Sequence, residues 1–171
     1  IATDTSAVPE EALCWTNPAA VMSQKPSYIA TLRQLPINRI SMGIQTFHED
    51  TLKLLNRRHT ARQAIEAFQQ CREAGFRNIS IDLMYGLPGE TQEMWESDLQ
   101  QAIALHPEHI SAYHLIYEEG TALWELKEKH HVEEAHEELS LRLFTLLIDR
   151  LTEAGYQHYE ISNFCMPGLH S

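Results

Sequence analysis

Asp82 is the residue whose surroundings most directly suggest chemistry. It lies within residues 79–85, where the odd positions are large and apolar and the even positions are smaller or polar. This alternation predicts a β-strand with one packing face and one partly polar face. Because an unpaired buried charge is costly, we expect the Asp82 carboxylate either to be satisfied by structural hydrogen bonds or to contact a ligand.

Gln45 and Arg57 are two further candidates for ligand contact. Residues 38–45 show the same alternation, and Gln45 ends this expected strand on its small and polar side. Arg57 begins the sequence Arg57-Arg58-His59, and a guanidinium can form paired hydrogen bonds with a carboxylate or a phosphate. The alternatives are a structural hydrogen bond for Gln45 and a solvated side chain for Arg57.

Two other stretches look like binding motifs but lack essential members. Gly86-Leu87-Pro88-Gly89 is neither GxGxxG nor a P-loop with its lysine, so a tight turn from strand to helix is the favoured interpretation. His130, His131 and His136 lie among several glutamates, which makes a zinc site an alternative. Because HExxH is absent, an acidic helical surface is favoured there.

Strand and helix signals alternate along the chain, and these elements must position the candidate side chains. Strands are expected over 12–16, 38–45, 79–85, 109–117 and 156–164. Helices are expected over 25–35, 60–75, 91–106 and 132–155, with a short helical segment around Leu52 and Leu55. Thr60 and Gln63 have the spacing of a capping box, and Thr91 is the expected cap of the next helix.

Four of the expected strands share an isoleucine followed by a serine, at Ser41, Ser80, Ser111 and Ser162. The serines are 39, 31 and 51 residues apart, about the length of one βα unit, so repeated units and a parallel sheet are predicted. Large aliphatic residues on one face and smaller, more polar residues on the other favour a barrel over an open sheet. The predicted fold class is α/β, a partial parallel (β/α) barrel.

Composition restricts the class of protein. The 171 residues include 43% hydrophobic residues, enough for the core of one domain, and the formal net charge of −11 disfavours binding to nucleic acid or to an anionic membrane. Cys14, Cys71 and Cys165 are too far apart for a clustered metal motif or a disulfide framework, which favours reduced thiols in the cytoplasm. Because the first residue is Ile1 and not Met, we expect a fragment of a longer protein.

Five segments resemble those of a known family. They are NRISMGIQTF (38–47), LNRRHT (55–60), NISIDLMYGLPGET (78–91), HISAYHLIYEEGT (109–121) and AGYQHYEISNFCMPG (154–168). In this order and spacing they resemble the radical S-adenosylmethionine family, and within it the branch of oxygen-independent coproporphyrinogen III oxidase-like proteins and HemW-type heme chaperones. The resemblance covers nearly all of the chain from residue 36 onward.

This resemblance implies part of a (β/α)6 barrel that holds S-adenosylmethionine and a [4Fe-4S] cluster in the intact, cytoplasmic protein. By the same resemblance, Gln45, Arg57 and Asp82 would contact S-adenosylmethionine, and the backbone at Ile116 would lie beside it. Asp82 could accept hydrogen bonds from ribose hydroxyls, Arg57 could pair with the methionyl carboxylate, and Gln45 offers both a donor and an acceptor.

Two departures from the family pattern are visible. The family's Glu-x-Asn-Pro appears here as Trp15-Thr16-Asn17-Pro18, so an indole stands where members carry a ribose-binding carboxylate. The CxxxCxxC motif and the glycine-rich segment of the family are absent, so this chain alone is not expected to bind the cluster. Residues 1–171 are therefore expected to be the central and C-terminal part of the barrel domain, without its N-terminal cluster-binding segment.

The resemblance implies a protein of heme metabolism, with a heme chaperone favoured over a true coproporphyrinogen III oxidase. A chaperone would bind heme and pass it to a membrane acceptor, whereas an oxidase would decarboxylate porphyrinogen propionates. A cluster-free α/β-barrel lyase that uses Asp82 is the alternative from another class. An incomplete parallel barrel exposes sheet edges, so we also expect association into oligomers.

Overall fold

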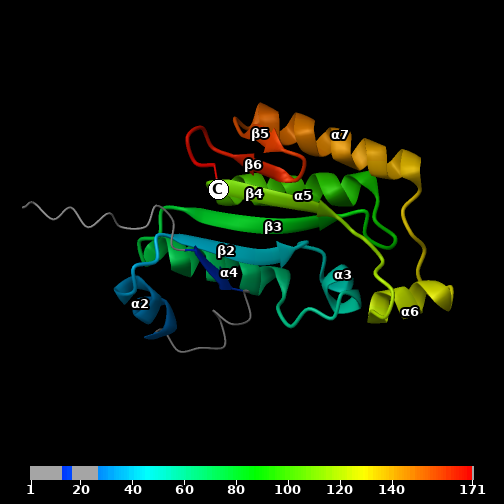
Figure 1. Cartoon of the computed structure of the whole chain (residues 1–171), viewed down its shortest axis with the longest axis horizontal. Helices are drawn as coiled ribbons and strands as arrows, with labels where there is room; N and C mark the ends of the chain where they lie inside the picture. Colours follow the sequence, from blue (N-terminus) through cyan, green and yellow to red (C-terminus); the bar gives the residue numbers. More distant parts are fainter. Residues whose placement is uncertain (1–12, 17–26, 171) are drawn as a thin grey trace, which may run out of the picture.

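Four of the six strands in the sheet run parallel to one another in the computed structural model, which describes residues 13–16 and 27–170 (Figure 1). The described strands lie in the order β1-β2-β3-β4-β6-β5. Strands β1 to β4 pair in parallel, and β6 pairs antiparallel with both β4 and β5. Their bounds are β1 Leu13–Thr16, β2 Arg39–Gln45, β3 Ile79–Tyr85, β4 His109–His114, β5 Gln157–Glu160 and β6 Asn163–Cys165.

Helices follow the strands and cover one face of the sheet. In Figure 1, α4 and α5 lie behind the parallel strands, and α3 and α6 lie near the ends of the arrows. The helix bounds are α2 Ser27–Gln34, α3 Glu49–Leu54, α4 Ala61–Glu73, α5 Gln92–Leu105, α6 Ala122–Glu128 and α7 Glu137–Glu153. No helix in the described ranges combines the length and apolar character needed to cross a membrane.

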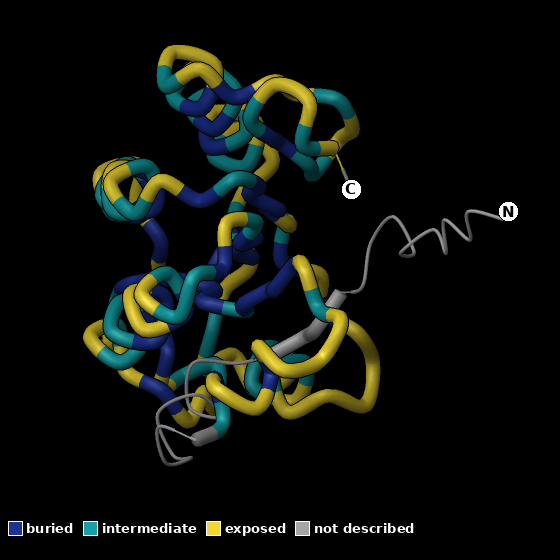
Figure 2. The backbone as a smooth tube through the Cα atoms, turned by 90° about the vertical axis from the view of Figure 1, so that its left-hand side faces the viewer, coloured by how far each residue is buried: buried dark blue, intermediate teal, exposed yellow. Residues whose placement is uncertain are grey.

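The hydrophobic core lies between the sheet and these helices, and Figure 2 shows the buried segments gathered there. Fully buried aliphatic side chains project from the strands toward α4, α5 and α7; they are Ile40, Met42, Ile44, Ile79, Ile81, Leu83 and Ile110. Trp95 on α5 is also fully buried, and its indole N–H donates a hydrogen bond of 3.0 Å to the Leu143 carbonyl oxygen on α7. This contact joins the two helices across the core.

The predicted helix starts at Thr60 and Thr91 are confirmed. The Thr60 hydroxyl accepts from the Gln63 N–H at 3.1 Å, and the Gln63 side chain accepts from the Thr60 N–H at 3.0 Å, which completes the capping box. The Thr91 hydroxyl accepts from the Met94 N–H at 3.3 Å. These hydrogen bonds satisfy N–H groups that have no partner within the first turn of a helix.

The prediction of one parallel strand over 156–164 is wrong. This segment forms an antiparallel hairpin of β5 and β6, and the Asn163 amide donates to the Glu160 carboxylate across its turn. Ile161 is 77% exposed in that turn, so the fourth isoleucine–serine pair does not belong to a repeated parallel strand. The direction of β6 follows from its antiparallel pairing with β4, at a place where a further βα unit would have given a parallel strand.

The bounds of two predicted elements need correction, and helix α6 was not predicted. The helix expected from residue 132 begins at Glu137, and α6 has no buried residue. Ile29 and Leu32 of α2 are buried, whereas Leu35, just beyond this helix, is 49% exposed. The expected strand over 109–117 ends at His114.

The Gly86-to-Gly89 turn allows a matched test of packing. Gly86 and Gly89 have positive φ angles of 73° and 71°, but a Cβ on Gly86 would lie 2.5 Å from His114 Nε2, whereas nothing lies within 4 Å of a Cβ on Gly89. We expect Gly89→Ala to lower the free energy of unfolding by about 1 kcal/mol through backbone strain, and Gly86→Ala by about 3 kcal/mol because the side chain also clashes. Urea unfolding followed by circular dichroism measures both; equal losses would contradict the contact with His114.

Candidate functional site

The polar face of the sheet brings together side chains from three parallel strands. The register pairs Ser41 with Ser80, Gly43 with Asp82, and Asp82 with Ser111, so these residues point to the same face. The polar residues on this face are at least 91% buried; they are Arg39, Ser41, Ser80, Asp82, His109 and Ser111. A buried polar face of this kind requires partners from neighbouring strands.

Asp82 lies at the centre of this polar face. The Ser41 hydroxyl lies 3.3 and 3.4 Å from its two carboxylate oxygens, and Ser111 is its neighbour on β4. Burial raises the pKa of Asp82, while the Ser41 hydroxyl, the charge of Arg39 and the Ser111 hydroxyl oppose this rise. Because the contacts to Ser41 are long and shared, the carboxylate keeps capacity to accept further hydrogen bonds.

Gln45 is directed to the same face by an irregularity at the end of β2. The register shifts between Gly43 and Gln45, and Gln45 has a positive φ of 74°. Its side chain folds back over Gly43, where an added Cβ would lie 2.7 Å from Gln45 Nε2. Since Gly43 pairs with Asp82, the structure brings the Gln45 amide and the Asp82 carboxylate onto adjacent strands of one face.

Arg57 lies in the loop after α3, and its side chain is exposed. The loop is tied to the end of β2 because the buried His59 ring donates from Nε2 to the Ile44 carbonyl oxygen at 3.1 Å. Burial lowers the pKa of His59, and the nearby charge of Arg57 lowers it further. Arg57 is therefore held near the carboxyl end of β2, although its guanidinium points to solvent.

Ile116 lies two residues after β4 and is 73% exposed. The preceding Leu115 N–H donates to the Tyr85 carbonyl oxygen at 2.8 Å, so the chain continues beside β3 past the end of β4. Gln45 ends β2, and Arg57 and Ile116 lie beyond the carboxyl ends of β2 and β4, whereas Asp82 lies in the middle of β3. Gln45 and Asp82 share the polar face, and Arg57 and Ile116 are exposed at its border.

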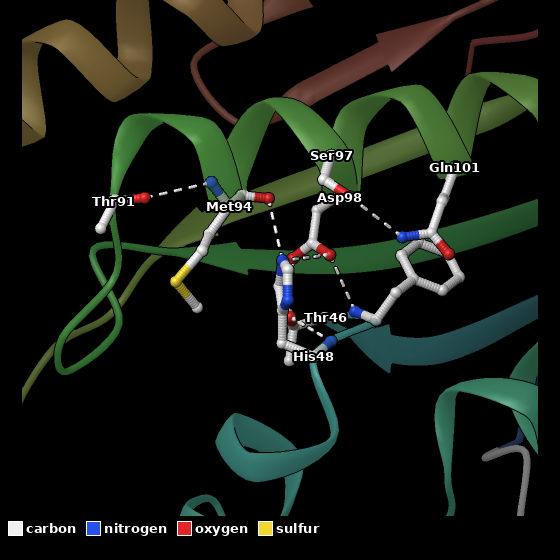
Figure 3. Close-up of polar contacts among 8 residues, drawn as sticks. Thr46, His48, Thr91, Met94, Ser97, Asp98 and Gln101 are labelled. Atoms are coloured by element: carbon white, nitrogen blue, oxygen red, sulfur yellow. Dashed lines mark hydrogen bonds and ion pairs between the residues drawn. The ribbon is translucent and has the colours of Figure 1, made fainter.

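Asp98 on α5 is a functional candidate that the sequence analysis missed. Figure 3 shows it pointing from α5 toward Thr46 and His48, just after β2. The Thr46 hydroxyl and the Phe47 N–H donate to its carboxylate at 2.6 and 2.9 Å, and His48 Nε2 lies 3.4 Å away. The available signal was an aspartate three residues after the buried Trp95, on the apolar stripe of the predicted helix.

Glu90 is a second buried carboxylate that the sequence analysis missed. It is 6% exposed and accepts hydrogen bonds from the Gly86 and Leu87 N–H groups at 2.6 and 3.2 Å. Burial raises its pKa from 4.5 to about 7, and the charge of Asp98 adds to the rise, whereas the two backbone hydrogen bonds oppose it. Glu90 therefore closes the turn after β3, which supports the interpretation of Gly86-Leu87-Pro88-Gly89 as a connector.

A metal site does not assemble in the described part of the chain. Within residues 13–16 and 27–170, no group of three or more His, Cys, Asp or Glu side chains is arranged to hold a metal ion. Cys71 and Cys165 are both buried free cysteines. Asn17 and Pro18 of the Trp15-Thr16-Asn17-Pro18 segment lie outside the described residues, and the backbone of Trp15 pairs with that of Ser41.

Glu90→Gln should reveal the titration of this buried carboxylate. Because the pKa is about 7 in the folded protein against an ordinary 4.5, the stability that protonated Glu90 contributes is complete below pH 4.5 and is lost as the pH rises through about 7. We expect the free energy of unfolding of the wild type, relative to Glu90→Gln, to decrease over this interval. Urea unfolding at several pH values measures the difference, with the exposed Glu128→Gln as control; a difference independent of pH would contradict the assignment.

Comparisons with known proteins show the family of this chain. The family model of the radical SAM superfamily matches residues 8–102. The heme chaperone HemW of Lactococcus lactis is 38% identical over 143 residues, which are 84% of this chain and 38% of that protein. The heme chaperone HemW of Bacillus subtilis is 35% identical over 155 residues, which are 91% of this chain and 40% of that protein. The chain thus spans well under half the length of these relatives.

The solved structures show the same architecture. Coproporphyrinogen III oxidase (HemN) from Escherichia coli, described as a radical SAM enzyme, superposes with a TM-score of 0.78 at 25% identity, over 92% of this chain and 36% of that chain. This likeness confirms the predicted α/β partial barrel, whose sheet is not closed within the described residues. It also confirms the predicted resemblance to the HemW and HemN branch. The chain belongs to the radical SAM superfamily.

Proposed function

We propose that this chain forms part of the S-adenosylmethionine-binding barrel of a heme chaperone. The observation that carries the proposal is the meeting of Gln45 and Asp82 on the polar face, where Gln45 ends β2 on the side of the sheet at which ligands bind in parallel barrels. Membership of the radical SAM superfamily and the similarity to two HemW heme chaperones support it.

The side chains present fit the groups of S-adenosylmethionine. Asp82 would accept hydrogen bonds from the ribose hydroxyls, since its carboxylate has only long contacts to Ser41. The Gln45 amide would offer a donor and an acceptor beside it, and the exposed Arg57 guanidinium would pair with the methionyl carboxylate. The exposed backbone after β4, at Ile116, would border the ligand.

The [4Fe-4S] cluster requires cysteines that this chain does not offer as a group. We propose that they come from a CxxxCxxC segment of a longer protein, to which residues 1–171 contribute the central and C-terminal part of the barrel. When bound, the cluster supplies the electron for reductive cleavage of S-adenosylmethionine. The gene sequence preceding Ile1 tests this: a CxxxCxxC motif there excludes the cluster-free lyase, and a start codon immediately before Ile1 argues against the radical SAM function.

The proposal extends to the partners of the intact protein. A heme chaperone would take up heme in the cytoplasm and transfer it to a membrane acceptor. The edges of the open sheet, β1 and β5, would support association with further strands or with a second copy. A second candidate is a true oxygen-independent coproporphyrinogen III oxidase, which is favoured by the structural likeness to HemN.

Replacing Asp82 tests the cofactor site. In the intact, cluster-reconstituted protein, we expect Asp82→Ala to weaken S-adenosylmethionine binding by at least about tenfold, because the acceptor for the ribose hydroxyls is lost. Isothermal titration calorimetry measures the affinity, and circular dichroism verifies the fold. Asp149→Ala, at an exposed position on α7, is the control. Unchanged binding by Asp82→Ala would exclude this site.

Heme titration separates the chaperone from the oxidase. For a chaperone, we expect a change in the Soret band of heme on addition to the intact protein, followed by transfer to an acceptor. The competing outcome is no Soret change and no transfer, together with decarboxylation of coproporphyrinogen III, which is measured by the loss of its propionate carboxyl groups as carbon dioxide. That outcome would establish the oxidase as the function.

A further inference from the structure

We propose that Asp98 is a positioning residue for S-adenosylmethionine, which holds the end of β2 so that the Gln45 side chain stays on the face of Asp82. This inference rests on the proposed function and adds a residue of α5 to the site. Asp98 would not touch the cofactor itself. Its effect would pass through the backbone of the three residues that follow Gln45.

Gln45 has a backbone conformation that needs support from its neighbours. A positive φ of 74° in a residue other than glycine costs about 1–2 kcal/mol. The register shift next to Gly43 has the same consequence, because it removes regular ladder pairing just where the side chain must turn back. The neighbouring structure therefore has to hold this geometry.

Asp98 accepts hydrogen bonds from the residues immediately after Gln45. Its carboxylate accepts from the Thr46 hydroxyl at 2.6 Å and from the Phe47 N–H at 2.9 Å. The Thr46 oxygen in turn accepts from the His48 N–H at 3.1 Å, and the His48 ring donates from Nε2 to the Met94 carbonyl oxygen at 3.0 Å. Residues 46–48 are thus held by two separate points on α5 (Figure 3).

Helix α5 is itself held in place by the core and by α7. Asp98 is fully buried, and the neighbouring Trp95 and Leu99 are also fully buried in the core. Toward α7, the Glu96 carboxylate accepts two hydrogen bonds from the Arg150 guanidinium, at 3.0 and 2.6 Å. On the other side of Gln45, the His59 ring holds the Ile44 carbonyl oxygen. Both residues that flank Gln45, Ile44 and Thr46, are therefore held by hydrogen bonds to buried side chains.

The residue that precedes the N-cap of α5 also contacts the backbone after β3. Glu90, just before the Thr91 cap of α5, accepts from the backbone N–H groups that follow β3, the strand that carries Asp82. Asp98, in the middle of α5, thus contacts the residues after β2, and Glu90, just before the N-cap, contacts the turn after β3. Burial raises the pKa of both carboxyl groups, and His48 and Glu90 are the titratable groups that face Asp98.

The test compares Asp98→Ala with Asp98→Asn in the intact, cluster-reconstituted protein, with S-adenosylmethionine as the ligand. We expect Asp98→Ala to raise the dissociation constant about tenfold in the folded fraction, with the stoichiometry unchanged, because Thr46 and Phe47 lose their acceptor. Asp98→Asn keeps an acceptor for Phe47 and a partner for Thr46, so we expect it to restore the affinity to within about threefold of the wild type. Asp149→Asn on α7 is the matched exposed control.

Amide hydrogen exchange gives a readout that does not need the cofactor. We expect the Phe47 amide to exchange faster in Asp98→Ala than in Asp98→Asn, with exchange in β4 unchanged. If Asp98→Ala does not fold, Thr46→Val takes its place, since it removes the hydroxyl donor to Asp98 at nearly constant volume; we expect about a threefold weaker affinity.

The outcomes separate this inference from the proposed function. A purely structural role would lower the melting temperature or the binding stoichiometry but leave the dissociation constant of the folded fraction unchanged in Asp98→Ala and Thr46→Val. That result, with Asp82→Ala still losing binding, would overturn the positioning role alone. A wild-type protein that does not bind S-adenosylmethionine would overturn both.

Discussion

The parallel register of β2, β3 and β4 is the constraint on which the candidate site depends. It places Gly43, Asp82 and Ser111 side by side, so that one face of the sheet collects polar groups while the other buries aliphatic side chains against the helices. A slip of one residue would exchange the two faces and drive the Asp82 carboxylate into the core. The hydrophobic pattern and the site are therefore specified together.

The buried carboxylates of Asp82, Glu90 and Asp98 differ in their hydrogen-bond partners. This difference distinguishes a carboxylate that holds the backbone from one that can bind a ligand. Asp98 and Glu90 accept short hydrogen bonds from backbone N–H groups, at 2.9 and 2.6 Å, and each fixes the end of a strand. Asp82 receives the Ser41 hydroxyl at the longer distances of 3.3 and 3.4 Å. A carboxylate with loose partners on a polar face is better suited to receive a ligand than one saturated by the backbone.

Local pattern predicted the elements whose signals lie within a few residues. Period two located β2 and β3, and the Thr60 capping box located α4, because both arise from contacts between near neighbours in the chain. The β5–β6 hairpin was missed because strand direction depends on pairing with β4, which is about 50 residues away in the chain. Asp98 was missed because its partners, Thr46 and Phe47, are 52 and 51 residues away. Asp82 and Gln45 were found from pattern, but their meeting depends on the bulge at Gly43, which no alternation predicts.

Because β6 runs antiparallel to β4, the chain that follows β6 and the candidate site lie at opposite ends of the parallel strands. Cys165 pairs with His109 at the start of β4, and the Met166 N–H donates to the Glu108 carbonyl oxygen, so the chain beyond β6 leaves at the amino edge of the parallel strands. Figure 1 places the C-terminus there, away from α3 and α6 at the opposite edge. A fluorophore attached to the chain beyond β6 would therefore lie at the opposite end of the parallel strands from Gln45 and Ile116, and it would leave the candidate site free.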